Sequence, residues 1–387
     1  MKGSVEIGKV MGIPIKLHIS FILILPLFVW TFAEKSPVPF GFKGMESNYL
    51  FSALAVVLLF TCVVFHELSH SSVAIRNGIK IDSITLFIFG GVASIEKIPR
   101  DPNVESRMAL AGPGMSIAIG ATFFTSFLIS SSLLDGVSGI NLLEGFYSTL
   151  LTMEGYEGAV SEITVLFFIL GYLNMFLAIF NLLPAFPMDG GRFLRAYFAK
   201  RMSYLKATRK AVYFGKVIAV LMGIFGFLVN PFLVLIAFFI YIGATEEEKA
   251  TIIDISLEGT KVGDLFSTDV MSISPDASIT ELTVLMFKEK HMGYPVVGEG
   301  IDSGNVLGVV TLHDIRGIAM EDRDSMKVSD VMSENVICTS PEDDAVDALK
   351  LMSKNNIGRL IVMENEAMIG ILSRTDLMKA IELKRER

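Results

Sequence analysis

The sequence predicts a polytopic α-helical membrane domain followed by an α+β domain that is written twice. Three observations lead to this fold class. Hydrophobic residues make up 52% of the 387 residues and charged residues only 19%, which is far from the composition of a soluble protein. The long apolar runs are concentrated in residues 1–245. Residues 246–387 have an ordinary soluble composition and contain an internal repeat.

The formal charge divides at the same point. Residues 1–245 hold 18 Lys and Arg against 14 Asp and Glu, a net charge of +4, whereas residues 246–387 hold 15 against 27, a net charge of −12. An acidic tail argues against nucleic-acid binding. The two cysteines, Cys62 and Cys338, are too few for a disulfide framework. The first apolar run, Ile13 to Ala33, lacks the small-residue cleavage site of a signal peptide.

Six apolar segments are candidates for membrane helices, because about 20 mostly apolar residues are needed to span a bilayer. They lie near residues 14–33, 50–75, 107–133, 162–183, 212–229 and 231–245. The last two are short and are separated by Asn230-Pro231, a turn signal, so they can form one hairpin of tilted helices.

Lysine and arginine predict the orientation, because loops rich in these residues stay in the cytosol. With the N-terminus inside, the outer segments hold only Lys35 and Lys43, and segment 134–161 holds neither residue type. The sequence therefore predicts a multi-pass protein of the cell membrane with a cytosolic N-terminus and a cytosolic C-terminal tail.

The second span contains ionisable residues in the motif HELSH, namely His66, Glu67 and His70. Ionisable side chains within a span are costly and usually functional. Two imidazoles at positions i and i+4 lie on one helical face and can bind one zinc ion, with the intervening glutamate acting on its water. The alternative, two histidines packed against neighbouring helices, leaves the cost of burying three polar side chains unexplained.

A catalytic zinc ion takes three protein ligands, so one more is needed. The fourth span ends in NLLPAFPMDGGR, where Asp189 follows Pro184 and Pro187 and precedes Gly190-Gly191. These residues cannot continue a helix, and irregular backbone at membrane depth is tolerated only where it lines a protein cavity or water. Asp189 is therefore the candidate third ligand. The alternative is a surface turn formed by Asp189 and Gly190.

These residues resemble a known family. HELSH in an early span and NLLPAFPMDGG at the end of a later one are similar to the two signature motifs of the site-2 proteases, and the resemblance covers roughly residues 1–230. It implies that His66, His70 and Asp189 bind zinc and that Glu67 is the general base. It also implies that Asn181 helps to hold the substrate or the developing oxyanion.

Two positions depart from the family pattern. Met188 stands where many relatives have leucine, which is a conservative change. Ala111-Gly112-Pro113 in the third span resembles the family, but Ser116 stands where asparagine is expected. This second departure is expected to affect packing only.

Residues 79–98 are rich in β-branched residues, with Gly90-Gly91 as a break, and are predicted to form a β-hairpin or a bent strand. The resemblance implies a membrane-associated sheet here, with Gly90, Gly91 and Val92 beside the active site as substrate-binding residues. A helical substrate hides its peptide bonds in its own hydrogen bonds, and adding it to a sheet edge would extend it. The alternative is a plain cytosolic hairpin.

The tail repeats one strand–helix–strand–strand–helix unit over residues 261–320 and 327–385, after a linker at residues 246–260. VGDLFSTDVMSISPDASI matches VSDVMSENVICTSPEDDAV, and GVVTLHDI matches GILSRTDL. Each copy resembles a cystathionine-β-synthase (CBS) domain. Two such domains usually pack as one module, through which a homodimer can also form.

Both copies have the CBS family's ribose-and-phosphate motif, at Thr311 and Asp314 and at Ser373 and Asp376. A carboxylate can accept the two ribose hydroxyls, and a helix N-terminus can meet phosphate. The resemblance thus implies AMP, ADP or ATP as a regulatory ligand. The alternative is that these residues only cap the final helix of each copy.

Together these features predict an intramembrane zinc metalloprotease, with one zinc ion per chain, that hydrolyses peptide bonds in transmembrane proteins and is regulated by adenine nucleotides. A CBS-regulated transporter or channel with an intramembrane metal site is the main alternative. A zinc-dependent membrane enzyme that is not a protease is the third. A glutamate beside the two histidines favours hydrolysis, because transport needs no general base beside the ligands.

Overall fold

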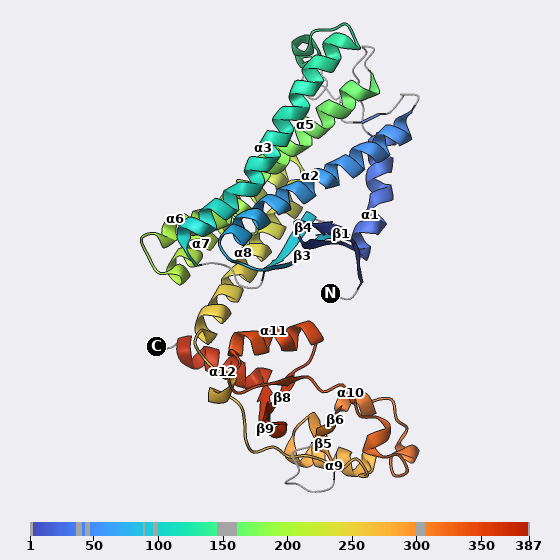
Figure 1. Ribbon diagram of the computed structural model, residues 1–387, viewed down its shortest axis with the longest axis vertical. Coiled ribbons are helices and arrows are strands. Elements are labelled where there is room, and N and C mark those ends of the chain that lie inside the picture. Colours follow the sequence, from blue (N-terminus) through green and yellow to red (C-terminus); the bar gives the residue numbers. More distant parts are fainter. Residues whose placement is uncertain are drawn as a thin grey trace. The chain divides into compact units, whose positions relative to one another are not determined.

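The computed structural model divides the chain into two compact units, Met1–Lys249 and Ala250–Arg387 (Figure 1). The described residues are 3–35, 41–42, 47–87, 90–95, 100–144, 161–298 and 306–385. Lys43 and most of segment 134–161 lie outside the described residues. Both were used to predict the orientation in the membrane.

The first unit is built mainly from helices. They are α1 (Ile19–Trp30), a short π-helical turn (Thr31–Lys35), α2 (Asn48–Arg76), α3 (Pro102–Leu133), α5 (Glu162–Asn181), α6 (Asp189–Ala199), α7 (Tyr204–Val229) and α8 (Pro231–Leu257). Within the described part of the chain, four helices are long and apolar enough to cross a membrane: α2, α3, α5 and α7. They correspond to four of the six predicted spans.

The first predicted span, residues 14–33, differs from the structure. Ile13–His18 is a strand, and helix α1 begins at Ile19, where the His18 side chain accepts a hydrogen bond from the Ser20 amide. The reason is a period-two pattern at the start of the apolar run, since Ile13 and Ile15 are both buried. Only residues 19–33 of the predicted span are therefore helical, as α1 and the π-helical turn.

The end of the first unit also differs from the expectation. Helix α8 is continuous from Pro231 to Leu257. It includes the predicted short span 231–245 and also residues 246–257, most of the segment interpreted as a linker. No proline or glycine other than Gly243 interrupts this stretch after its first residue, so the helix continues past the apolar part of its sequence.

Helices α3 and α5 lie side by side, and small residues bring them close (Figure 1). A methyl group on Gly120 of α3 would lie 3.3 Å from the carbonyl oxygen of Gly171 in α5. The Thr164 hydroxyl donates a hydrogen bond to Ser130 across the same pair, at 3.1 Å. Small residues and interhelical hydrogen bonds are how helices associate in lipid, because lipid supplies no hydrophobic drive between them.

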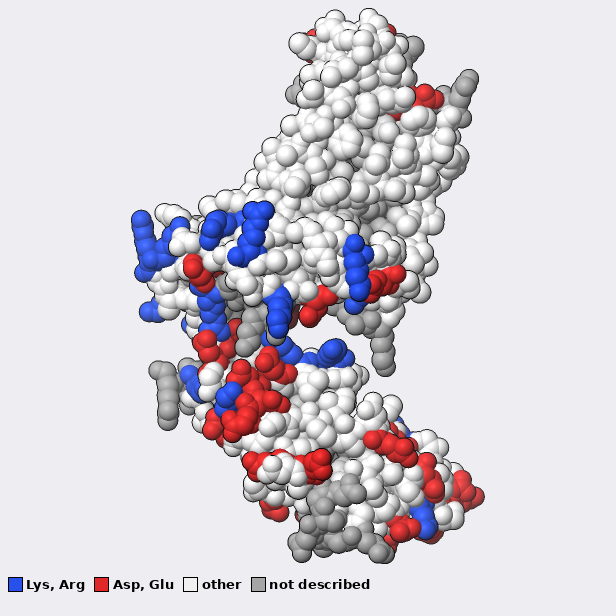
Figure 2. Space-filling model, viewed as in Figure 1, with Lys and Arg blue, Asp and Glu red and all other residues white. Residues whose placement is uncertain are grey.

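Charged side chains avoid the long part of the helical unit. On the face shown in Figure 2, few lie along the upper length of the bundle, whereas Lys and Arg gather at the end that holds α6 and the start of α7. The exposed basic residues of that segment are Lys200, Arg201, Lys206, Arg209 and Lys210. This distribution is typical of helices that are surrounded by lipid over most of their length.

A four-stranded sheet packs against α2. Its strands are β1 (Ser4–Val10), β2 (Ile13–His18), β3 (Ile81–Phe87) and β4 (Gly90–Ile95), in the order β1-β2-β3-β4. The β3–β4 pair is the hairpin predicted over residues 79–98, and the two N-terminal strands were not predicted. Strands β2 and β3 pair in parallel, with Ile15 opposite Ile84, and both side chains pack with Leu68 of α2.

The second unit contains the predicted repeat. The first copy has a 3-10 turn (Val262–Asp264), α9 (Ile279–Glu289), β5 (Gly293–Val297), β6 (Val306–Thr311), α10 (Leu312–Ile315) and a second 3-10 turn (Met320–Asp322). The second copy has a 3-10 turn (Val328–Asp330), β7 (Cys338–Thr339), α11 (Ala345–Asn355), β8 (Arg359–Glu364), β9 (Ala367–Ser373) and α12 (Arg374–Arg385). The α+β tandem CBS fold is thus confirmed.

The two copies exchange their N-terminal arms. The first arm pairs with the second copy at Ser267 and Ile371, and the second arm pairs with the first copy at Ser333 and Val309. Val262 of the first arm lies in the hydrophobic core of the second copy. Val328, its counterpart in the repeat, lies in the core of the first. Each copy therefore completes the other's core.

Matching ion pairs accompany the exchange. Lys261 donates to Asp344 at 2.9 Å, and Lys327 donates to Asp276 at 2.6 Å. In each pair the hydrogen bond to the carboxylate raises the pKa of the lysine amine. These pairs are exposed, so they add specificity to the exchange more than stability.

Candidate metal centre

Helix α2 brings His66 and His70 to one face. The helix runs without interruption over 29 residues, so the spacing of four residues stacks the two imidazoles one turn apart. Both side chains face the interior, since His66 is 3% exposed and His70 is 9% exposed. The two histidines of the HELSH motif are thus buried in an apolar helix, as the sequence predicts.

Asp189 is the first residue of α6, which follows the break after α5. The break is compact because of the two glycines. A methyl group on Gly190 would lie 2.2 Å from the Leu183 carbonyl oxygen, and one on Gly191 would lie 2.6 Å from the Phe186 nitrogen. Only glycine allows the chain to fold back this closely on the start of α6. A carboxylate in the first turn also suits the positive end of the helix dipole.

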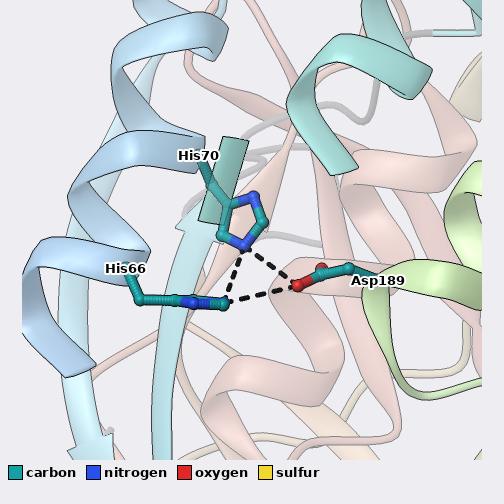
Figure 3. A group of neighbouring side chains, drawn as sticks. All are labelled: His66, His70 and Asp189. Carbon is teal, nitrogen blue, oxygen red and sulfur yellow. Dashed lines mark hydrogen bonds and ion pairs between the residues drawn. The ribbon is translucent and has the colours of Figure 1, made fainter. Parts of the chain in front are cut away.

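The three side chains converge (Figure 3). The Nε2 atoms of His66 and His70 lie 3.1 Å apart. Asp189 Oδ2 lies 3.4 Å from His66 Nε2 and 3.1 Å from His70 Nε2. Residues from two helices that are more than a hundred positions apart in the sequence thus form one triangle of nitrogen and oxygen donors.

The triangle has the dimensions of a zinc site. Ligand atoms about 2.0–2.1 Å from a tetrahedral zinc ion lie about 3.3–3.4 Å from one another, close to the observed edges. The volume for an ion is also reserved by Gly112 of α3, because a methyl group there would lie 2.2 Å from His70 Nε2 and 2.6 Å from His66 Nε2. Two imidazoles and one carboxylate are a common catalytic zinc ligand set.

Helix α3 supports the two imidazoles from behind. His66 Nδ1 lies 2.9 Å from the Ser116 hydroxyl, and His70 Nδ1 lies 2.7 Å from the Met108 carbonyl oxygen. The expectation that Ser116 affects packing only is therefore wrong, because its side chain touches a candidate ligand directly. Met108 was not assigned a role from the sequence, and Gly112 was noted only as part of Ala111-Gly112-Pro113, which resembles the family.

Glu67 lies next to the cluster and against the sheet. A methyl group on Gly91 of β4 would lie 2.5 Å from the Glu67 Cγ, so the strand backbone comes very close to this side chain. Gly90 has a φ of +128°, a conformation that glycine adopts without strain. The side chain of Val92 lies outside the described part of the structure. Gly91, one of the three residues predicted to bind the substrate, is thus beside the glutamate of the motif.

Asn181 is not brought into the cluster. It is the last residue of α5, and its amide donates to the Leu177 carbonyl oxygen one turn back, at 3.1 Å. Among the described residues, no hydrogen bond joins it to His66, His70 or Asp189. The role implied by the resemblance, holding the substrate or the oxyanion, therefore requires another orientation of the Asn181 amide.

Helix α6 is fastened by a buried arginine. Arg195 contacts Glu105 of α3 at 2.6–2.7 Å and Glu247 of α8 at 2.5 Å. Its guanidinium also lies over the rings of Phe186 and Tyr204, at 5.0 and 4.9 Å from their centroids. The helix that starts with Asp189 is thereby tied to α3 and α8, which restricts the position of the carboxylate.

The tail residues assigned to a nucleotide form helix caps. Asp314 Oδ2 accepts hydrogen bonds from the amide and hydroxyl of Thr311, both at 2.7 Å. Asp376 Oδ2 accepts from the amide and hydroxyl of Ser373, at 3.0 and 2.6 Å. These contacts are those expected if the two Thr/Ser–Asp pairs cap the final helix of each copy, which was the alternative to nucleotide binding. In each carboxylate one oxygen makes both of these bonds.

Comparisons with known proteins agree with both halves of the chain. The model of the family described as Peptidase family M50 matches residues 54–224, and the model of the CBS domain matches residues 262–321 and 328–383. A zinc metalloprotease of Methanocaldococcus jannaschii is 36% identical over 390 residues, which cover 100% of this chain and 99% of that protein. Rip3 of Mycobacterium tuberculosis is 28% identical over 398 residues, which cover 100% of this chain and 94% of Rip3.

A solved structure, the site-2 protease from Methanocaldococcus jannaschii, is 37% identical and covers 63% of this chain and 95% of that chain, with a TM-score of 0.41. Similarity to a zinc metalloprotease along the whole chain favours the peptidase over the transporter or channel. The chain belongs to peptidase family M50, the site-2 protease family of zinc metalloproteases, and carries two CBS domains in its C-terminal part.

Proposed function

We propose that this chain is an intramembrane endopeptidase that hydrolyses peptide bonds in transmembrane protein substrates. The observation that carries the proposal is the donor triangle of His66, His70 and Asp189, which lies among apolar helices with Glu67 beside it. Buried metal ligands next to a carboxylate are the requirements of metal-assisted hydrolysis.

Each residue has a separate role. His66, His70 and Asp189 hold one zinc ion, which when bound polarises the scissile carbonyl and lowers the pKa of a water molecule toward neutrality. Glu67 accepts the proton of the attacking water and passes it to the leaving amine. Asn181 holds the substrate backbone or the oxyanion, for which its amide must turn away from Leu177.

The substrate binds as an added strand along β4. Among the described residues, β4 pairs only with β3, so it is one of the two edge strands of the sheet and its other side is open. Gly90 and Gly91 carry no side chains, which allows a second backbone to approach, and Gly91 lies against Glu67. A transmembrane helix must unwind before a peptide bond can be attacked, and pairing with β4 replaces the hydrogen bonds that unwinding breaks.

Purified protein and single-span model substrates test this proposal, with and without a chelator. About one zinc ion per chain is expected from elemental analysis. His66→Ala, His70→Ala and Asp189→Ala should lose most of the zinc, whereas Glu67→Gln should keep zinc and lose cleavage. Full zinc and full activity in Asp189→Ala, or strong proteolysis in Glu67→Gln, would contradict the assigned roles.

Regulation by an adenine nucleotide is the second part of the proposal. The nucleotide binds the tail through Asp314 and Asp376, and it changes activity only if it binds two arrangements of the copies with different affinity. Calorimetry on residues 250–387 with AMP, ADP and ATP should show binding that Asp314→Ala and Asp376→Ala each weaken at one site. If AMP, ADP and ATP produce neither binding heat nor thermal stabilisation, nucleotide regulation is contradicted. The tail is then a docking or dimerisation module.

Orientation in the membrane is the third part. We place the N-terminus and the tail in the cytosol, because Lys and Arg are concentrated in the segments assigned to that side. Single cysteines at residues 138–156 should react with an impermeant reagent from outside the cell, and cysteines at residues 200–210 should not. The reverse labelling pattern would contradict this orientation.

A further inference from the structure

One face of α3 contacts both histidines of the candidate metal centre and the arginine that fastens α6. Glu105, Met108, Gly112 and Ser116 are spaced by three, four and four residues, which places them on the same side of a helix. Met108 and Ser116 contact the two imidazoles, and Glu105 contacts the arginine that fastens α6. Gly112 faces the donor atoms themselves.

The hydrogen bonds of this face suit one form of each histidine: the Met108 carbonyl oxygen can only accept, which fixes the tautomer of His70, and the Ser116 hydroxyl can accept from the same form of His66. A metal needs the lone pair of Nε2 on both rings, because the Nε2 atoms face Asp189. The ring proton must then lie on Nδ1. His66 Nδ1 donates to the Ser116 hydroxyl oxygen, and His70 Nδ1 donates to the Met108 carbonyl oxygen. A histidine ligand that donates its other N–H in this way is held in both tautomer and orientation.

The two hydrogen-bond acceptors on α3 differ in whether a substitution can remove them. The Met108 acceptor is a backbone carbonyl, which a side-chain substitution leaves in place. The Ser116 acceptor is a side chain with 0% exposure, so no bulk water stands ready to replace it. Ser116 is therefore the position at which the support of His66 can be removed by a single substitution.

Gly112 contributes space. A methyl group on it would lie within 2.2–2.6 Å of Nε2 of both histidines. That is close to the distance at which a zinc ion sits from its nitrogen ligands, about 2.0–2.1 Å. A side chain at this position would crowd both nitrogen ligands beside the place where the ion binds, and the backbone of α3 would still be intact. Residue 112 thus decides whether the donor triangle has room for anything at its centre.

We propose that α3 is the supporting wall of the zinc site, in which Ser116 is a positioning residue for His66 and Gly112 reserves the volume of the ion. This inference rests on the proposed zinc site. It assigns to a third helix two residues that act on zinc affinity and neither coordinate zinc nor touch the substrate.

Zinc affinity of the purified full chain, measured by competition with a chromogenic chelator, tests the role of Ser116. Ser116→Ala should weaken zinc binding about 10-fold or more, the range found when the hydrogen-bond partner of a histidine ligand is removed. The matched control is Ser71→Ala, because Ser71 is 1% exposed and, among the described residues, its hydroxyl has no hydrogen-bond partner. The control should bind zinc like the wild type.

A spectroscopic measurement separates positioning from general destabilisation. Cobalt(II) in place of zinc should give a visible band whose shape changes in Ser116→Ala and not in Ser71→Ala, because only the first frees the ring of His66. Thermal unfolding of the chelated proteins measures general destabilisation separately, and Ser116→Ala should lose more stability than Ser71→Ala, because only Ser116 leaves a buried hydrogen-bond partner unsatisfied. An unchanged cobalt band and unchanged affinity in Ser116→Ala would overturn the positioning role.

The role of Gly112 has its own pair of variants. Gly112→Ala should abolish zinc uptake, whereas Gly114→Ala on the same helix should not, because no atom lies within 4 Å of the methyl group that it adds. Wild-type affinity in Gly112→Ala would overturn the volume argument. If the wild type itself takes up no zinc, the proposed zinc site fails and this inference fails with it. If the wild type binds zinc and the variants do not differ from their controls, only this inference fails.

Discussion

Replacing Arg195 by methionine should destabilise the first unit by about 3–5 kcal/mol, the range for breaking a buried ion pair by removing one partner. Arg195 and Glu105 each have a side-chain exposure of 1%. Without the guanidinium, Glu105 stays buried with its charge uncompensated. Methionine keeps most of the apolar length of the arginine side chain, so the loss measures the charge and hydrogen bonds rather than a cavity.

The assay is unfolding of the purified protein in mixed micelles, titrated with a denaturing detergent. Arg201→Met is the matched control. Like Arg195, Arg201 lies near an aromatic ring, at 6.0 Å from the Tyr197 centroid, but Arg201 is exposed. The control should change the free energy of unfolding by less than about 0.5 kcal/mol. Glu247→Gln should cost less than Glu105→Gln, because Glu247 has a side-chain exposure of 23%.

The double variant Arg195→Met with Glu105→Gln makes the reasoning refutable. Once both charges are gone, no buried charge is left unpaired, so the double variant should be more stable than Arg195→Met alone. Two results would refute the argument. One is an Arg195→Met protein as stable as Arg201→Met. The other is a double variant whose loss equals the sum of the two single losses.

Three further outcomes follow from the structure. Gly91→Ala should reduce cleavage about 100-fold with zinc retained, because its methyl group would lie 2.5 Å from the Glu67 Cγ and displace the general base. Gly8→Ala is the control, because no atom lies within 4 Å of its methyl group. Equal activity in the two variants would contradict the role of Gly91. The joined tail should unfold cooperatively in circular dichroism, whereas fragments 250–326 and 327–387 should not, since each copy supplies part of the other's core. A cooperative transition in either fragment alone would contradict this. Chelation of the full chain should abolish cleavage and leave the thermal unfolding of the tail unchanged, and a shift in the tail transition would show a metal outside the candidate centre.

Several features depend on local sequence and were predictable. Histidines at positions 66 and 70 share a face wherever the segment is helical, because helix periodicity alone sets that geometry. The breakers around Asp189 end α5 where proline and glycine predict an end. The tail repeat is visible as a repeated pattern, and each Thr/Ser-to-Asp pair caps a helix by contacts within four residues.

Other features needed the packing of distant segments. The N-terminal strands were missed because β2 joins the sheet through parallel pairing with β3, and Ile15 and Ile84 are far apart in the chain. The exchanged arms of the tail were missed for the same reason, since a repeat shows which segments are alike but not which of them pair.

In the candidate metal centre, the residue types could be predicted from the sequence, whereas their relative positions could not. Its chemistry, two imidazoles and a carboxylate with a glutamate nearby, is written in short motifs, since each residue's type and its place on a helix are local properties. The distance from Asp189 to the histidines, the support by Ser116 and Met108, and the space left by Gly112 depend on how α3 and α6 lie against α2. These contacts arise from the packing of whole helices against one another, and no pattern within a single span carries that information.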